Sequence, residues 1–226
     1  PEIPLREGAA LDARGVRDFV LSSAAGPFQE DHVLFLENEG ASREALREAF
    51  FRFLGQVGRD DLLLVYLAGH GARDPAHPEN LHLLPQDARM DALAATGLPL
   101  WDLKTALRRH VAAERVLLIA DVSQPRALGQ LSEPGDRLVE ALSGIFTPSR
   151  RLTITATGPG EASAAGSGWG GHGVFTYHLL EGLSGAGDMD GNGIVTSTEL
   201  FHYVRERVRS ATGGSQNPGK TGLGNI

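Results

Sequence analysis

The sequence predicts an α/β domain in which helices cover both faces of a mainly parallel sheet. Three apolar runs, at residues 62–67, 116–120 and 152–156, have the length of strands and lack polar alternation, which indicates burial on both faces. Segments with apolar residues at helical spacing lie before, between and after these runs. Strands that alternate with helices are typical of βαβ units, whose strands run parallel.

The N-terminal part of the chain predicts two helices with a strand between them. Apolar residues within 11–20 fall at helical spacing, and residues 33–36 form a short apolar run of strand type. Ser42 is a suitable N-cap, because a serine hydroxyl can accept a backbone N–H at the start of a helix. Apolar residues then recur at helical spacing as far as Val57, which predicts the second helix.

Three further helices are predicted in the rest of the chain. Two of them lie at residues 100–111 and 175–183, where apolar residues again follow the helical period. The third begins near Thr196 and Glu199, which have the spacing of a capping box and precede an apolar stripe.

The chain of 226 residues has the length of one α/β domain. We expect residues 1–212 to form that domain and residues 213–226, which lack apolar periodicity, to form an extended C-terminal tail or linker. Two stretches rich in Gly, Pro, Ser or Ala, at residues 124–136 and 158–173, are long for loops of a compact domain. Loops of that length are often functional.

Composition narrows the class of protein. Acidic residues outnumber basic ones by 28 to 21, and the net charge of −7 argues against nucleic-acid binding. No apolar run approaches the roughly 18–20 residues that cross a bilayer, and no signal peptide is visible, so we expect a cytoplasmic protein without membrane contacts. The absence of cysteine excludes a disulfide scaffold, a cysteine-ligated zinc site and, as the sequence stands, a cysteine nucleophile.

Chemically active residues follow two of the predicted central strands. The first strand runs into the tetrapeptide AGHG, which contains His70, and the second runs into DVS, which ends at Ser123. If the strands are neighbours, we expect the two side chains to face each other, because ligands bind outside the carboxyl ends of parallel strands. Histidine is well suited to moving a proton near neutral pH, and the flanking glycines leave its imidazole accessible.

The sequence around these two residues resembles the caspase and metacaspase superfamily of cysteine peptidases, and in particular its bacterial members. The matching segments are LLLVYLAGHG (62–71), RVLLIADVS (115–123), HGVFTYHLLEGL (172–183) and QNP (216–218). The resemblance implies a caspase-like α/β/α sandwich. The segment around Asp12 is similar to the part of the family that follows its first strand, so we expect that strand to be missing from this chain.

The resemblance also implies roles for individual residues. His70 corresponds to the catalytic base, and Ser123 stands at the position of the nucleophilic cysteine. The backbone amides of Gly71 and Ser123 are the expected oxyanion donors. Asp121 corresponds to an aspartate that helps to form an acidic pocket for a basic P1 residue, the residue before the cleaved bond. Trp169 lies where the family lines its substrate cleft, although it could equally anchor its own glycine-rich loop.

Two positions depart from the family pattern. Ser123 replaces the cysteine, and Gln124-Pro125 stand where the family usually has His-Ser. A serine hydroxyl is far less ionised than a thiol near neutral pH, so we expect the chain to be close to inert. Three explanations fit: a Cys-to-Ser change engineered to trap substrate or prevent self-cleavage, a natural pseudoprotease, and a true serine peptidase, which would lack the usual Gly-x-Ser-x-Gly motif.

A second motif, DMDGNGIVTSTE, occupies residues 188–199 and has the pattern of an EF-hand calcium loop. The expected ligand oxygens belong to Asp188, Asp190, Asn192, Ile194 (its backbone carbonyl) and Glu199. A local interpretation is also open, in which Thr196 and Glu199 form a capping box and the acidic and glycine residues form a turn. The two interpretations are compatible, because an EF loop runs into its exiting helix.

The sequence therefore predicts an endopeptidase domain that cleaves protein substrates after Arg or Lys through a Cys-His dyad, and that is inactive here because of Ser123. The alternative is a natural pseudoprotease, a non-catalytic protein-binding or regulatory domain. No cofactor is expected for catalysis, and Ca²⁺ is expected only at residues 188–199. The expected partners are a protein or peptide substrate and other domains or subunits of a larger assembly, but not nucleic acid or a membrane.

Overall fold

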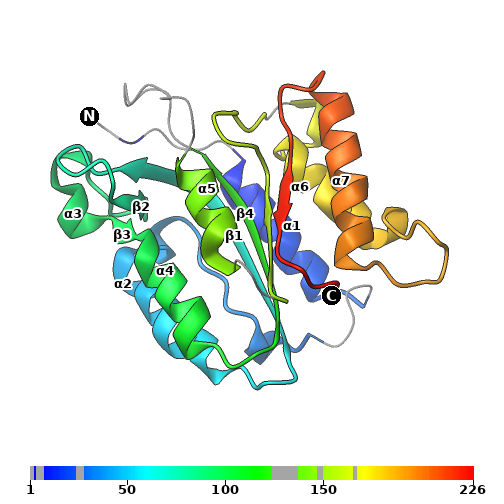
Figure 1. Ribbon diagram of the computed structural model, residues 1–226, viewed down its shortest axis with the longest axis horizontal. Helices are drawn as coiled ribbons and strands as arrows, with labels where there is room; N and C mark the ends of the chain where they lie inside the picture. Colours follow the sequence, from blue (N-terminus) through cyan, green and yellow to red (C-terminus); the bar gives the residue numbers. More distant parts are fainter. Residues whose placement is uncertain (1–2, 4–7, 24–27, 124–136, 147–149, 165–166) are drawn as a thin grey trace.

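The centre of the protein is a six-stranded sheet with the strand order β3-β2-β1-β4-β5-β6 (Figure 1). The computed structural model describes residues 3, 8–23, 28–123, 137–146, 150–164 and 167–226. The strands are β1 (Leu62–Arg73), β2 (Leu81–Leu83), β3 (Leu98–Pro99), β4 (Arg115–Ser123), β5 (Leu152–Thr155) and β6 (Gly219–Thr221). β1, β4 and β5 run parallel in the middle, and the strands outside them pair antiparallel. The predicted α/β fold with a parallel centre is confirmed.

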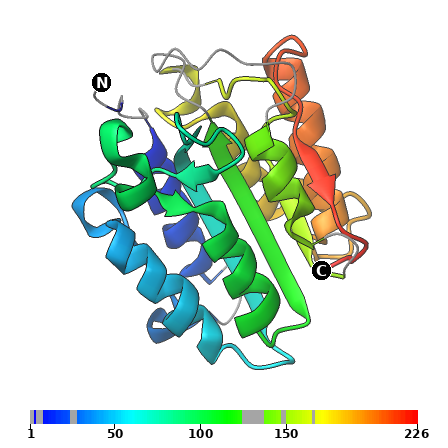
Figure 2. The ribbon, with the colours of Figure 1, turned by 60° about the vertical axis from the view of Figure 1, so that its left-hand side comes forward.

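Helices cover both faces of the sheet, as Figures 1 and 2 show from two directions. One face carries α1 (Ala9–Val20), α6 (Val174–Glu181) and α7 (Ser197–Ala211). The other carries α2 (Arg43–Glu48), α4 (Leu100–Thr105) and α5 (Arg137–Ser143), and α3 (Leu93–Thr96) is a single turn before β3. Among the described helices, none combines the length and the apolar character needed to cross a membrane.

The central strands separate two apolar cores. In β4, Leu118 is fully buried against α2, α4 and α5, while its neighbour Ile119 is 1% exposed against α1, α6 and α7. Adjacent residues of a strand point to opposite faces, so two-sided burial explains why this run shows no polar alternation. In β1 burial is less complete than predicted, because Leu62 at its start is 38% exposed.

The predicted helices are present. The Ser42 hydroxyl accepts a hydrogen bond from the backbone N–H of Ala45, and the helix that begins there continues in further helical turns as far as Gln56. The helix predicted from residue 100 is α4 together with a turn that ends at His110. At the start of α7, Thr196 and Glu199 form the predicted capping box.

The strand predicted at residues 33–36 is wrong. These residues have no strand partner in the described part of the sheet and lie between two short 3₁₀ turns. Leu34 is 44% exposed, and Phe35 packs under the guanidinium of Arg17, 4.7 Å from it, instead of entering a sheet. A short apolar run can cover the surface of a helix as well as form a strand, and periodicity alone does not distinguish the two.

β1 and β4 extend further than predicted and include the residues expected in loops. Their parallel pairing runs from Leu62 opposite Arg115 to His70 opposite Ser123. β1 then continues to Arg73 by pairing antiparallel with β2. Partner strands supply these hydrogen bonds, so the glycines beside His70 do not end the strand.

Residues 213–226 begin with a turn after α7 and then pack onto the sheet. Gly219–Thr221 form β6, which pairs with β5. Gln216 is fully buried: its Oε1 accepts from the N–H of Ala164 and its Nε2 donates to the carbonyl of Ala156. In the structure this segment therefore packs on the domain and contributes its edge strand β6.

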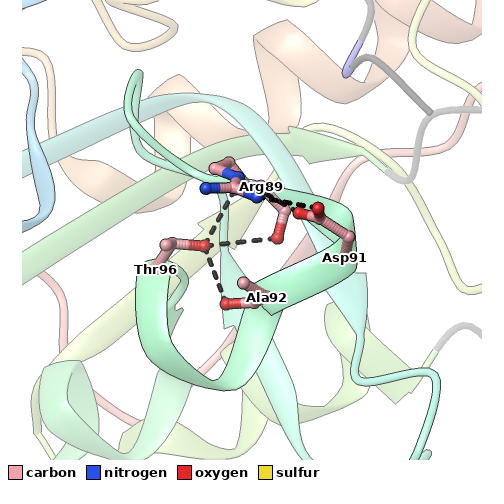
Figure 3. Close-up of polar contacts among 4 residues, drawn as sticks. All are labelled: Arg89, Asp91, Ala92 and Thr96. Carbon is pink, nitrogen blue, oxygen red and sulfur yellow. Dashed lines mark hydrogen bonds and ion pairs between the residues drawn. The ribbon is translucent and has the colours of Figure 1, made fainter.

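The connection between β2 and β3 is closed by a local hydrogen-bond network (Figure 3). The Thr96 hydroxyl accepts from the backbone N–H of Arg89 at 2.8 Å and lies 3.0 Å from the carbonyl oxygen of Ala92, to which it donates. The guanidinium of Arg89 pairs with Asp91 on the surface. This network holds the turn before β3 and so orders the edge of the sheet beside β1.

Candidate active site

His70 and Ser123 lie side by side at the carboxyl ends of the two central strands. They are register partners in β1 and β4, so their side chains leave the same face of the sheet, the one covered by α1, α6 and α7. The Nδ1 atom of His70 is 3.3 Å from the carbonyl oxygen of Ser123. A carbonyl oxygen only accepts, so Nδ1 carries the proton, and in the neutral ring Nε2 is the nitrogen that can take one up.

Asp121 lies two residues before Ser123 and points to the same face. The side chain is fully buried, and its Oδ1 accepts a hydrogen bond from the Ser163 hydroxyl at 2.7 Å. Ser163 belongs to the long loop after β5, and nothing in the sequence marks it as a residue of the site. A buried carboxylate needs such donors, because transfer of an unpaired charge out of water is costly.

A second buried carboxylate, Asp12 of α1, lies close to Asp121. Asp12 is 1% exposed and its Oδ1 is 2.8 Å from Nδ1 of His172. A side chain on Gly173 would begin 3.2 Å from Oδ2 of Asp12 and 3.5 Å from Oδ2 of Asp121. The sequence held one signal for this residue: Asp12 falls on the buried stripe of its helix, four residues before Val16.

The loop that carries Ser163 is fastened by the C-terminal segment. Gln216 holds the backbone N–H of Ala164, and the backbone N–H of Asn217 donates to Oε2 of Glu161 at 2.6 Å. In the sequence, Gln216 and Asn217 stand out only as part of the family resemblance. The structure shows that they position the loop that contacts Asp121.

The chain matches a known protein family over nearly its whole length. Residues 3–222 match the family profile of the caspase domain. The chain belongs to the caspase-domain family. A search among curated proteins finds no significant match. Caspase-like domains act on protein substrates, and the match covers every strand described above, including β6.

In this caspase domain, the amides predicted to bind an oxyanion belong to strand ends. Ser123 is the last residue of β4, and Gly71 pairs with Leu83 of β2. A side chain on Gly71 would begin 2.6 Å from a methyl group of Leu138 in α5, so a larger residue would have to displace that leucine. The donor role of the two amides stays a prediction.

Trp169 of the caspase domain packs against α6. Its ring centroid is 5.4 Å from that of Tyr177 and 5.3 Å from that of His178. These contacts anchor the loop that precedes α6, which is one of the two roles considered for the tryptophan. A contact with substrate stays a prediction.

The acidic loop at residues 188–199 leads into α7, apart from the carboxyl ends of β1 and β4 (Figure 1). Ligand oxygens of Asp188, Asp190 and Glu199 lie within 4.8 Å of one another. Hydrogen bonds from the side chain and backbone of Thr196 lower the pKa of Glu199, so its carboxylate is charged near neutral pH. Three oxygens at this separation can converge on one hard cation.

Proposed function

We propose that the chain is the peptidase domain of a caspase-like endopeptidase that cleaves proteins after Arg or Lys. The observation that carries this proposal is the register of β1 and β4. It places His70 opposite residue 123, and it places the buried carboxylate of Asp121 on the same face of the sheet. A histidine base, the nucleophile position and a buried carboxylate would then act together at the carboxyl ends of the two central strands.

In a cysteine form, each group has a definite task. Nε2 of His70 takes the proton from the thiol, and the thiolate attacks the carbonyl carbon of the scissile peptide bond. Backbone N–H groups at Gly71 and residue 123 stabilise the oxyanion, and the imidazolium then gives its proton to the leaving amine. Water hydrolyses the thioacyl intermediate. With Ser123 the first step fails, because the hydroxyl keeps its proton where a thiol, with an ordinary pKa of about 8.5, can lose it.

The preference for a basic P1 residue follows from the two buried carboxylates. Asp12 and Asp121 both border Gly173, and both are nearly inaccessible to water. Like charges buried close together favour a cation between them, and a guanidinium or ammonium group can donate to both.

Ser123→Cys tests the proposal. We expect the variant to cleave a fluorogenic peptide with Arg at P1 at least about 100-fold faster than the unchanged chain, because only the thiol can ionise at the site. Ser210→Cys, which adds a thiol at an exposed position of α7, is the matched control and should stay inert. His70→Ala in the Ser123→Cys background should remove the gain.

The rival proposal is a non-catalytic binding domain, and Ser123 is the observation that favours it. Both the unchanged chain and Ser123→Cys would then be silent toward Arg and Lys peptides, with calcium present. That outcome would contradict the peptidase proposal.

We also propose that residues 188–199 bind Ca²⁺, since three of the expected ligands lie close together and Glu199 is ionised. Titration calorimetry with CaCl₂ should give binding heat for the chain and none for Asp188→Ala. Asp91→Ala, which removes an exposed carboxylate elsewhere, should keep the heat. Equal heats for the chain and Asp188→Ala would rule the site out.

A further inference from the structure

His172, in the loop before α6, contacts the buried carboxylate of Asp12, and the catalytic proposal gives this histidine no role. His172 lies just before α6, and Asp12 lies 160 residues earlier in α1, yet Nδ1 of the histidine is 2.8 Å from Oδ1 of the aspartate. The His172 side chain is 19% exposed and that of Asp12 is 1% exposed. A polar pair that is nearly buried and joins two distant segments has a defined geometry, because water cannot replace either partner.

The approach of this loop to α1 depends on missing side chains. A Cβ on Gly15 would lie 3.1 Å from Cε1 of His172, and one on Gly8 would lie 2.9 Å from the carbonyl oxygen of Gly171. Gly8 has a φ of +86°, a conformation that favours glycine. Gly8 and Gly15 therefore leave room for the loop beside α1, and the imidazole of His172 packs against the helix at Gly15.

His172 and Ser163 each contact the Oδ1 atom of one of the two carboxylates. Oδ1 of Asp12 lies 2.8 Å from Nδ1 of His172 and accepts from the backbone N–H of Gly173 at 3.1 Å, which also lies 3.3 Å from Oδ2, and Oδ1 of Asp121 accepts from the Ser163 hydroxyl. The Oδ2 atoms of both aspartates border the same point at Gly173. His172 thus controls the rotation of the Asp12 carboxylate relative to Asp121.

We propose that His172 is a specificity-determining positioning residue. The hydrogen bond from its Nδ1 orients Asp12, so that Asp12 and Asp121 together receive the cationic side chain of a peptide. This inference rests on the proposed function and adds to it the residue that sets the strength of the basic preference. A planar guanidinium gains most, since its fork of donors needs acceptors at fixed positions.

Peptide binding to the Ser123 chain tests this directly, because the bound peptide is not consumed. Titration calorimetry would compare two peptides that differ only in arginine or its neutral isostere citrulline. We expect His172→Ala to lower the preference for arginine about tenfold, the worth of one charge-assisted hydrogen bond. His172→Asn should retain the preference, since the Asn Nδ2 donor takes the place of Nδ1. His202→Ala, at an exposed position of α7, is the control and should change nothing.

The arginine preference of the His172→Ala variant distinguishes a positioning role of His172 from a purely structural one. An unchanged arginine preference in His172→Ala overturns the inference and leaves the proposed function standing. Equal weakening toward both peptides means that His172 is only structural, which also overturns it. If the unchanged chain does not distinguish the peptides, the basic preference fails, and the inference fails with it, while the Ser123→Cys assay still tests peptidase activity. If His172→Ala does not fold, His172→Gln replaces it, and its displaced donor should lower the preference.

Discussion

Asp121→Asn in the Ser123→Cys form is expected to lower kcat/KM for a P1 arginine peptide by about 30- to 5,000-fold, the range for truncating one partner of a buried charge pair. Asparagine has the same shape as aspartate, and its side-chain oxygen can still accept from Ser163, which now donates to Oδ1 at 2.7 Å. The change therefore removes charge from a fully buried site while it keeps the packing. Hydrolysis rates for arginine and citrulline peptides measure the effect.

The citrulline peptide separates specificity from general damage. Its cleavage should change little or rise, because a neutral P1 residue no longer faces an unpaired buried charge. Asp102→Asn is the control, since Asp102 is also buried, at 9% exposure, but belongs to α4 on the opposite face of the sheet. Parallel losses for both peptides would show that Asp121 supports the fold and does not bind the P1 side chain.

Arg151→Met is expected to lower the free energy of unfolding by about 3 kcal/mol, because a cation that donates to several buried acceptors contributes more than one ordinary hydrogen bond. The guanidinium donates to the backbone carbonyls of Leu107, Val111 (2.8 Å) and Ala113 (2.7 Å). These carbonyls end the helical turn after α4 and begin the approach to β4, where they have no further helical partner. Burial lowers the pKa of Arg151, but an arginine remains charged near neutral pH.

Chemical denaturation of Arg151→Met and of the control variant Arg150→Met measures the loss of stability. Methionine keeps the apolar stem of the arginine, so the difference reports mainly on the hydrogen bonds. Arg150→Met is the matched control, because Arg150 is exposed and its substitution should change stability by less than about 0.5 kcal/mol. If both variants unfold at the same denaturant concentration, the contacts of Arg151 do not carry the helix end.

The middle of the sheet and the ends of its strands differ in how far sequence could predict them. The runs at residues 116–120 and 152–156 are apolar throughout, and β4 and β5 form there. Two-sided burial imposes that composition locally, so a local pattern reveals it. The glycines around His70 suggest a loop by composition, yet pairing with β4 and β2 keeps the segment in a strand. A partner far along the chain leaves no mark on local periodicity.

The residues of the candidate site also differ in how far the sequence could predict them. His70, Asp121 and Ser123 come directly after apolar runs, where the sequence resemblance points to them, and their roles stay predictions. Ser163 and His172 lie in the glycine-rich stretch at residues 158–173, whose sequence does not show which of its residues contact the aspartates. Each reaches its aspartate because glycines and the buried Gln216 allow or hold a close approach of segments far apart in the chain.

Composition and periodicity alone are sufficient for the α/β class, the parallel centre and the capped α7, and the family resemblance adds the expectation of a cysteine where Ser123 stands. These depend on residues within about two helical turns of one another, or on single positions beside a strong pattern. The pairing of Asp12 with Asp121, the extension of β1 through His70 and the place of residues 219–221 in the sheet depend on contacts between distant segments. Such contacts form only when both cores pack, and no local stretch of sequence contains both partners.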